Sequence, residues 1–143
     1  MKKRFLQLSI AVIASMALLT VATPQIKQII KVVGVGAAVD QFGDDINKAI
    51  NRLSKHTDTN AKFTKVVPIL SVGVGKSSAI GAAQVMGTKA QVEQVEAVAS
   101  PEMDLFGKEI RIRAMIPVSD KNVLKGIKTV PGVGVSGIVD LKL

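Results

Sequence analysis

The chain has 143 residues, with 19 Lys and Arg against 11 Asp and Glu, and contains no Trp, Tyr or Cys. A chain of this length supports one domain with one core, and the lack of cysteine excludes a disulfide framework. Nucleic-acid and carbohydrate sites usually stack their ligands on aromatic side chains, so we interpret the net charge of +8 as a solvated basic surface and expect no nucleic-acid partner.

The first segment is typical of a secretory signal peptide. A basic start, MKKR, precedes an apolar run over residues 5–22. Thr20 and Ala22 would occupy the −3 and −1 positions, so we expect cleavage after Ala22 and a single mature domain over residues 23–143. The chain would then be periplasmic, exposed at the cell surface or secreted. The alternative is an uncleaved membrane anchor, because the run approaches the roughly 20 residues that span a bilayer.

Residues 26–55 are predicted to form a long amphipathic helical segment. Its apolar positions recur at spacings of three and four, with acidic and basic residues opposite them. Gly34 and Gly36 interrupt this pattern, so we expect a break or bend there. We interpret the apolar face as core-facing, with a membrane-surface helix over residues 26–42 as the alternative. The face comprises Ile26, Ile29, Ile30, Val33, Val39, Phe42, Ile46, Ile50 and Leu53.

Residues 56–63 are predicted to be a polar loop, and they include the only histidine, His56. We expect this histidine to be solvated. Metal sites need clustered His, Cys or carboxylate ligands at defined spacings, and none appear in the sequence. We therefore expect no metal and no cofactor.

Residues 64–143 are predicted to hold the sheet, organised around a β-hairpin. Two apolar runs, Val66–Val74 and Ala79–Met86, flank a Gly/Lys/Ser turn, which is a hairpin pattern. The turn contains GVGKSS, which shares its last residues with a phosphate-binding P-loop. However, Leu70 stands where that motif needs its first glycine, and a strand rather than a helix is expected to follow. We therefore predict no nucleotide binding.

Residues 88–99 are predicted to be a helix, with a strand as the competing interpretation. Thr88 and Gln91 have the spacing of a capping box, whereas valine-rich segments favour sheets. Pro101 is expected to end the segment, which leaves residues 100–107 as a loop.

Residues 109–118 are predicted to form one strand, because Ile110, Ile112, Ala114 and Ile116 alternate with Arg111, Arg113 and Met115. Such alternation is typical of a sheet covered on one side. We expect Ile112 to be buried between the sheet and a helix, with Arg111 and Arg113 in solvent.

A short helix over residues 119–128 is predicted next, capped by Ser119 or Asp120. Its inward residues would be Val123, Leu124 and Ile127. A turn at residues 130–132 would then lead into a last strand with one apolar face. That face comprises Val135, Val139, Leu141 and Leu143.

The closing pattern of a short helix, the turn Val130-Pro131-Gly132-Val133 and a strand resembles the end of BON-type envelope domains and of other small α/β sandwiches. The resemblance covers residues 120–143. It implies a binding module of the cell envelope.

The predicted fold is α+β, with a four- to five-stranded mixed or antiparallel sheet and helices packed on one face. We expect a small exported, non-enzymatic binding or structural module of the bacterial cell envelope, whose partner is an unknown protein or envelope component. Two alternatives stay open: a peripheral lipid- or membrane-associating protein, and a small hydrolase that uses Ser77 or Ser78. The carboxylate pairs Asp44/Asp45 and Glu93/Glu96 are expected on solvent faces, so no catalytic residue is predicted.

Overall fold

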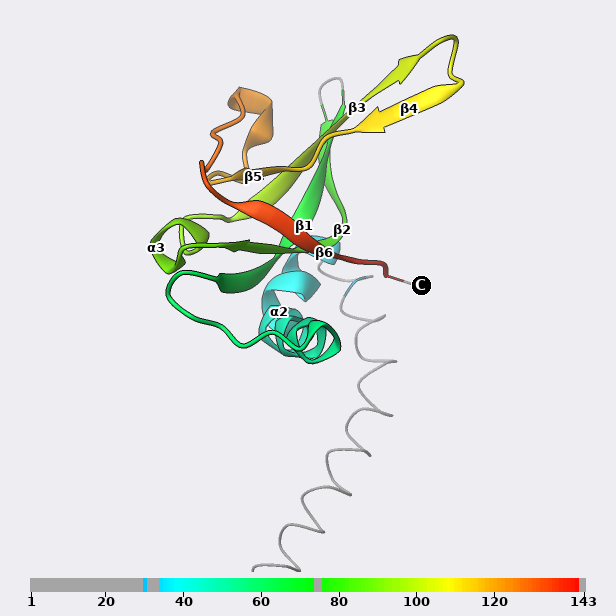
Figure 1. Ribbon diagram of the computed structural model, residues 1–143. Coiled ribbons are helices and arrows are strands. Elements are labelled where there is room, and N and C mark those ends of the chain that lie inside the picture. Colours follow the sequence, from blue (N-terminus) through cyan, green and yellow to red (C-terminus); the bar gives the residue numbers. More distant parts are fainter. Residues whose placement is uncertain (1–29, 31–33, 74–75, 142–143) are drawn as a thin grey trace, which may run out of the picture.

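One main helix packs against a curled, six-stranded mixed sheet (Figure 1). The computed structural model describes residues 30, 34–73 and 76–141, without the side chains of residues 76 and 77. The predicted signal peptide and the first residues of the predicted helical segment lie outside this part. The elements in chain order are α2 (Val35–Ser54), β1 (Phe63–Gly73), β2 (Lys76–Gly87), α3 (Lys89–Val92), β3 (Ala97–Leu105), β4 (Ile110–Arg113), β5 (Ile116–Val118), the 3-10 turn η1 (Val123–Lys125) and β6 (Gly134–Val139).

The strand order is β4-β3-β1-β2-β6, and β5 also pairs with β3. β1 and β3 are parallel, whereas the other strand pairs are antiparallel. The α+β class and the mixed sheet are therefore confirmed. The sheet has one strand more than the upper limit of the prediction.

α2 begins directly after Gly34, whose φ of 91° is easily adopted only by glycine. The expected break in the helical segment therefore lies at Gly34, while Gly36 lies inside α2. At the other end Lys55 adopts φ 56°, and its N–H donates to the carbonyl oxygen of Arg52 at 3.3 Å. A left-handed residue at this place is a common way to end a helix.

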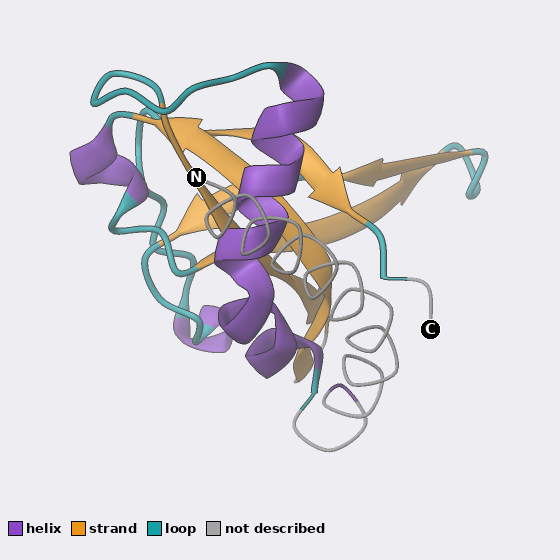
Figure 2. Cartoon of the chain, turned by 90° about the horizontal axis from the view of Figure 1, so that it is seen from below, coloured by secondary structure: helices purple, strands orange, loops and turns teal. Residues whose placement is uncertain are grey.

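The predicted apolar face of α2 packs on the β1–β2 hairpin. Figure 2 shows strands of the sheet behind the helix. Val39 is buried against Val66 and Ala82. Ile50 packs against the same cluster, but Leu53 is 86% exposed in the last turn of the helix. The prediction is thus confirmed for the middle of the helix and wrong at its end.

The β1–β2 hairpin is confirmed, and its strands are longer than predicted. Pairing runs from Phe63 opposite Gly87 to Gly73 opposite Lys76, with one irregularity beside Ile69. Neighbouring side chains on a strand point to opposite faces. Accordingly, Val66 packs under α2, whereas Val67 belongs to a second cluster of buried residues.

This second cluster contains Val92 of α3 and Val130, which lies just before the turn that leads into β6. The prediction of helices on one face therefore holds for α2 alone, because α3 covers the other side. The core lies on both faces of the hairpin.

The predicted helix over residues 88–99 is wrong beyond its first turn. Thr88 donates to Oε1 of Gln91 at 3.0 Å, so the two side chains bond to each other instead of capping backbone groups. From Ala97 the chain is a strand, because this segment is fully buried between β1 and β5. Burial in a sheet has outweighed the local helical signal.

The predicted loop over residues 100–107 is also wrong, because β3 continues through Pro101. Pro101 is the last β3 residue opposite β1, and Glu102 is the first opposite β4. Proline has no N–H to donate, so a change of pairing partners is a place where a strand can hold one.

The single strand predicted over residues 109–118 is two strands, β4 and β5, separated by Ala114 and Met115. β5 pairs with the first part of β3, inside the core, whereas β4 pairs with the last part. Ile112 on β4 is 42% exposed, so the prediction that it is buried is wrong. The alternation of isoleucine with arginine correctly predicted a strand, but β4 lies beyond the part of the sheet that the helices cover.

The predicted helix over residues 119–128 is only the turn η1. Asp120 accepts a hydrogen bond from the N–H of Asn122 at 2.9 Å, which forms a local turn instead of a helix cap. Val123 is 4% exposed as expected, but Leu124 and Ile127 are 52% and 40% exposed. A turn this short can direct only one of the three side chains inward.

The predicted turn before β6 is confirmed, but the single apolar face of the last strand is wrong. The pairing with β2 shifts between Gln84 and Val85, which leaves Ser136 as an extra residue in β6. Such a bulge reverses the facing of the residues beyond it. Val135 therefore packs with the α3 cluster, and Val139 packs under α2. Leu143 lies outside the described residues.

Candidate functional site

The predicted hydrolase residues lie in β2 next to the turn of the β1–β2 hairpin. Ser77 is opposite Val72, and Ser78 is opposite Ser71, whose hydroxyl lies 3.0 Å from that of Ser78. The described hydrogen bonds of Ser78 go to Ser71 and to no base. A serine nucleophile needs a base within hydrogen-bond distance, and the described contacts of Ser78 supply none. As expected, a strand follows the glycine-lysine-serine motif.

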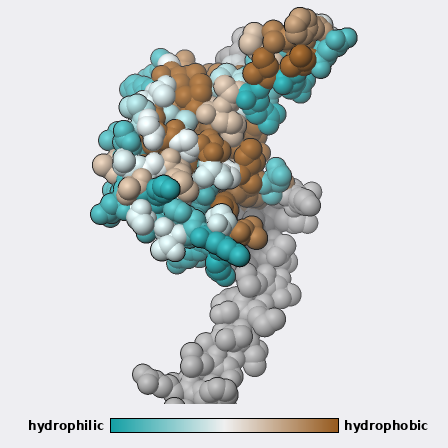
Figure 3. Space-filling view, viewed as in Figure 1, coloured by the Kyte–Doolittle hydropathy of each residue, from teal (hydrophilic) through white to brown (hydrophobic). Residues whose placement is uncertain are grey.

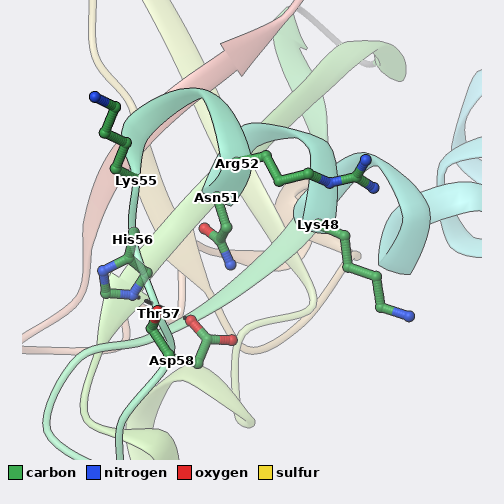
Figure 4. A pocket seen from close by; sticks show the side chains of 7 residues that line it. All are labelled: Lys48, Asn51, Arg52, Lys55, His56, Thr57 and Asp58. Atoms are coloured by element: carbon green, nitrogen blue, oxygen red, sulfur yellow. Dashed lines mark hydrogen bonds and ion pairs between the residues drawn. The ribbon is translucent and has the colours of Figure 1, made fainter.

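A surface pocket lies at the end of α2, around His56 (Figure 4). Figure 4 shows the side chain of Lys55 pointing away from those of Lys48 and Arg52, so the three charged ends do not converge on one point. Nε2 of His56 lies 3.2 Å from Oδ1 of Asp58 and 3.0 Å from the carbonyl oxygen of Lys62. Both oxygens are acceptors.

Nε2 of His56 therefore carries the hydrogen, and the ring links the start of the loop to Asp58 and to the carbonyl oxygen of Lys62. The expectation of a solvated histidine is wrong, because the His56 side chain is only 16% exposed. The loop folds back so that the Lys62 carbonyl reaches the ring.

A buried polar network joins this pocket to the sheet. Nε2 of Gln84 donates to Oδ1 of Asn47 and of Asn51, at 2.9 and 2.7 Å. Both asparagine amides donate to Oγ1 of Thr64, at 3.0 and 2.9 Å. Thr64 donates onward to Oδ1 of Asp58 at 2.6 Å. A satisfied network of this kind fixes the position of α2 on the sheet.

This network was not among the features predicted from the sequence. Its signal was the spacing of Asn47 and Asn51, which places two amides on one helix face next to the apolar residues. Gln84 is the matching polar residue inside an otherwise small and apolar strand. Its Oε1 accepts a hydrogen bond from Ser136 at 2.7 Å, so the described contacts use both ends of the Gln84 amide.

A second cleft lies between α2, β1 and the loops before β3 and η1. Its two lysines are both engaged: Nζ of Lys121 lies 2.8 Å from Oδ2 of Asp40, and Lys65 donates to the carbonyl oxygen of Val95 at 2.7 Å. The predicted carboxylate pairs Asp44/Asp45 and Glu93/Glu96 are exposed, as expected. Among the described residues, no group of three or more His, Asp or Glu could hold a metal ion.

The most unusual surface is the hairpin formed by the end of β3 and β4, which projects from the body of the molecule (Figure 1). In this hairpin Met103 pairs with Ile112 and Leu105 with Ile110, so these four side chains share one face. Met103, Ile110 and Ile112 are 57%, 45% and 42% exposed. We call these four residues the hairpin apolar face. Figure 3 shows apolar surface along the projection.

The opposite face of the hairpin is charged and internally paired. Arg113 lies 2.7 Å from Oε1 of Glu102, and Arg111 lies 3.3 Å from Oδ1 of Asp104. These pairs are solvent-exposed, so each contributes at most about 1 kcal/mol to stability. Their placement leaves the hairpin with one polar and one apolar side.

The tip of the hairpin holds three successive residues in left-handed conformations: Phe106, Gly107 and Lys108, with φ of 53°, 61° and 81°. A left-handed conformation costs a non-glycine residue roughly 1–2 kcal/mol. Phe106 is also 74% exposed. The left-handed backbone and the exposed ring of Phe106 both cost stability, so folding alone does not explain a phenylalanine at this position. Such strained residues concentrate at functional sites.

Within residues 34–73 and 76–141, no helix is both long enough and apolar enough to cross a bilayer. Val39, which belongs to the stretch considered for a membrane surface, is 1% exposed and packs on the sheet. Residues 26–29 and 31–33 of that stretch lie outside the described part of the chain.

Comparisons with family models, with curated proteins and with solved structures found no match for the chain. The resemblance of residues 120–143 to BON-type domains therefore has no support from a family model. The structure also places only the turn η1 where that pattern has a helix. The projecting hairpin is therefore the feature of the described residues that points most clearly to a function.

Proposed function

We propose that the chain is a small exported, non-enzymatic protein of the bacterial cell envelope, which acts as a binding or structural module through the hairpin apolar face. The observation that carries this proposal is the combination of an apolar face that no other described element covers with a strained, exposed Phe106 at the tip of the hairpin. Exposed apolar patches with polar borders are typical of interaction sites. Export is inferred from the basic start and the apolar run over residues 5–22.

The proposed partner is a protein with an apolar surface, not a lipid headgroup layer. Residues 102–113 carry three acidic and three basic side chains, so the hairpin has no net charge despite the +8 of the chain. Binding of proteins to anionic membranes depends strongly on basic residues next to the inserted apolar ones. A neutral hairpin lacks that attraction, whereas a protein interface buries apolar side chains without it.

Photo-crosslinking in the bacterium that produces the chain tests this proposal. A photoreactive phenylalanine derivative replaces Ile112 on the hairpin apolar face or, as the matched control, Arg111 on the charged face of the same strand. We expect protein adducts in the envelope fraction from position 112 and much weaker adducts from position 111. Equal adducts from both positions, or adducts of lipid alone, would contradict a protein-binding hairpin.

The intact mass of the chain from the same host tests export separately. We expect the accumulated form to begin near Thr23. A chain that still includes residues 1–22 and sediments with membranes would contradict cleavage and support an anchor.

A further inference from the structure

We infer that the partner of the hairpin apolar face is a second copy of this chain, and that two hairpins pack face to face in a symmetric dimer. This inference rests on the proposed function, because it names the partner of the same surface. The hairpin formed by the end of β3 and by β4 has an exposed apolar face. Within the described residues, Glu102–Leu105 of β3 pair only with β4. A two-stranded hairpin alone is marginally stable in water, so covering its apolar face stabilises it.

The shape of the surface favours an extended partner. A projecting two-stranded ribbon is not a groove, so a small ligand or a single inserted side chain would leave most of it uncovered. The same face on another copy of the chain is an apolar ribbon of the same length and the same hand of twist. In a twofold dimer one patch meets an identical patch, so the surface need only complement itself. Met103 can adapt its flexible side chain to such a contact.

The charges are compatible with this arrangement and oppose another. In face-to-face packing, the ion pairs of Glu102 with Arg113 and of Asp104 with Arg111 remain on the outer sides of the dimer. Because each hairpin is neutral, two copies do not repel each other there. Edge-to-edge pairing of two antiparallel β4 strands with matching faces would instead place arginines opposite arginines, which is destabilising.

The area of the contact sets its strength. The hairpin apolar face forms a patch on the order of a few hundred Å², which is the size of the functional patches on many monomers. Two such patches bury about twice that area together, which is below the roughly 1,200 Å² at which standard-size interfaces begin. We therefore expect a weak, reversible dimer, with a Kd of about micromolar or higher.

Sedimentation equilibrium of the chain, in the form that its host accumulates, tests the dimer. We expect a concentration-dependent monomer–dimer equilibrium that Ile112→Asp weakens about tenfold or more, as removal of a central apolar contact does. The matched control is Ile138→Asp, because Ile138 on the opposite edge of the sheet is 63% exposed. This control should leave the equilibrium unchanged. A wild-type chain that stays monomeric at all concentrations, or equal effects of the two variants, would overturn the inference.

Chemical cross-linking gives a second readout that does not depend on how Ile112→Asp folds. The chain has no cysteine, so Ile112→Cys and Arg111→Cys each introduce a single thiol. A bismaleimide with a spacer of about 10 Å matches the distance between packed sheets. It should join Ile112→Cys chains efficiently and Arg111→Cys chains poorly. The reverse preference, or no dimer from either variant, would overturn the dimer, while protein adducts from position 112 to another envelope component would leave the proposed function standing.

Discussion

The amide of Gln84 on β2 donates a 2.7 Å hydrogen bond to Oδ1 of Asn51 on α2. Gln84 is 1% exposed, so this bond lies inside the contact between the helix and the sheet. An apolar helix face can slide along an apolar sheet without losing much contact. Hydrogen bonds between buried amides have fixed partners, so they specify one position of α2.

Replacing Gln84 with Ala should therefore be strongly destabilising. The change leaves the amide oxygens of Asn47 and Asn51 without their present donor, and Ser136 keeps only its 3.3 Å hydrogen bond to the backbone carbonyl oxygen of residue 84. Each buried polar group that loses its bond costs about 1–3 kcal/mol, and partial relaxation lowers the sum, so we expect a loss of about 2–4 kcal/mol. Urea unfolding followed by far-UV circular dichroism measures it.

The matched control is Gln94→Ala, because Gln94 is exposed. It should change the free energy of unfolding by no more than about 0.5 kcal/mol. A similar, small effect of both substitutions would show that α2 is not held by Gln84 in solution.

Removal of two buried hydroxyl groups should have different effects on the free energy of unfolding. Oγ1 of Thr64 has three hydrogen-bond partners, whereas Oγ of Ser100 has none among the described residues. Thr64→Val should cost about 1–3 kcal/mol, because buried groups lose a bond. Ser100→Ala should leave stability unchanged or raise it, because no described bond is lost. A greater loss from Ser100→Ala than from Thr64→Val would contradict this assignment of the hydroxyls.

Because β4 projects from the core, replacing an isoleucine with alanine should lower the free energy of unfolding less on β4 than in the core. Ile69 is 5% exposed in the core, and Ile112 is 42% exposed on the hairpin. Ile69→Ala should cost about 2–5 kcal/mol, as for a buried isoleucine. Ile112→Ala should cost less than about 1 kcal/mol when the chain is dilute enough to be monomeric. Equal costs in urea melts would place β4 inside the core and contradict the projecting hairpin.

Local patterns were sufficient for the central hairpin and for the helix that covers it. The apolar runs around residues 75–78 predict β1 and β2, and the helical periodicity around Val39 predicts α2, because these features depend on neighbours in the sequence. The break at Gly34 was predictable for the same reason. These elements determine the α+β class.

The rest depended on contacts between distant segments. The alternation of Ile112 with its neighbouring arginines correctly indicated a strand with two different faces. Whether the apolar face is covered depends on where β3 ends relative to the helices, and no local pattern carries that information. The same limit applies to Ala97–Ala99, where burial between two strands decides against a helix. The candidate site could not be predicted for this reason: its defining property is an apolar face that the other described elements leave exposed.

The turn before β6 packs so closely against the end of β2 that one methyl group should disturb it. A Cβ atom at Gly87 would lie 2.8 Å from the carbonyl oxygen of Gly132 and 3.2 Å from Cγ2 of Val133. The first obstacle is backbone, so the turn itself would have to move, and overpacking of this kind costs about 1–3 kcal/mol. Gly134→Ala is the matched control, because a Cβ atom there meets nothing within 4 Å. It should leave stability unchanged or raise it by up to about 1 kcal/mol, since alanine restricts the unfolded chain. Urea melts of the two variants give the comparison; if they unfold at the same urea concentration, the turn does not pack on β2 in solution.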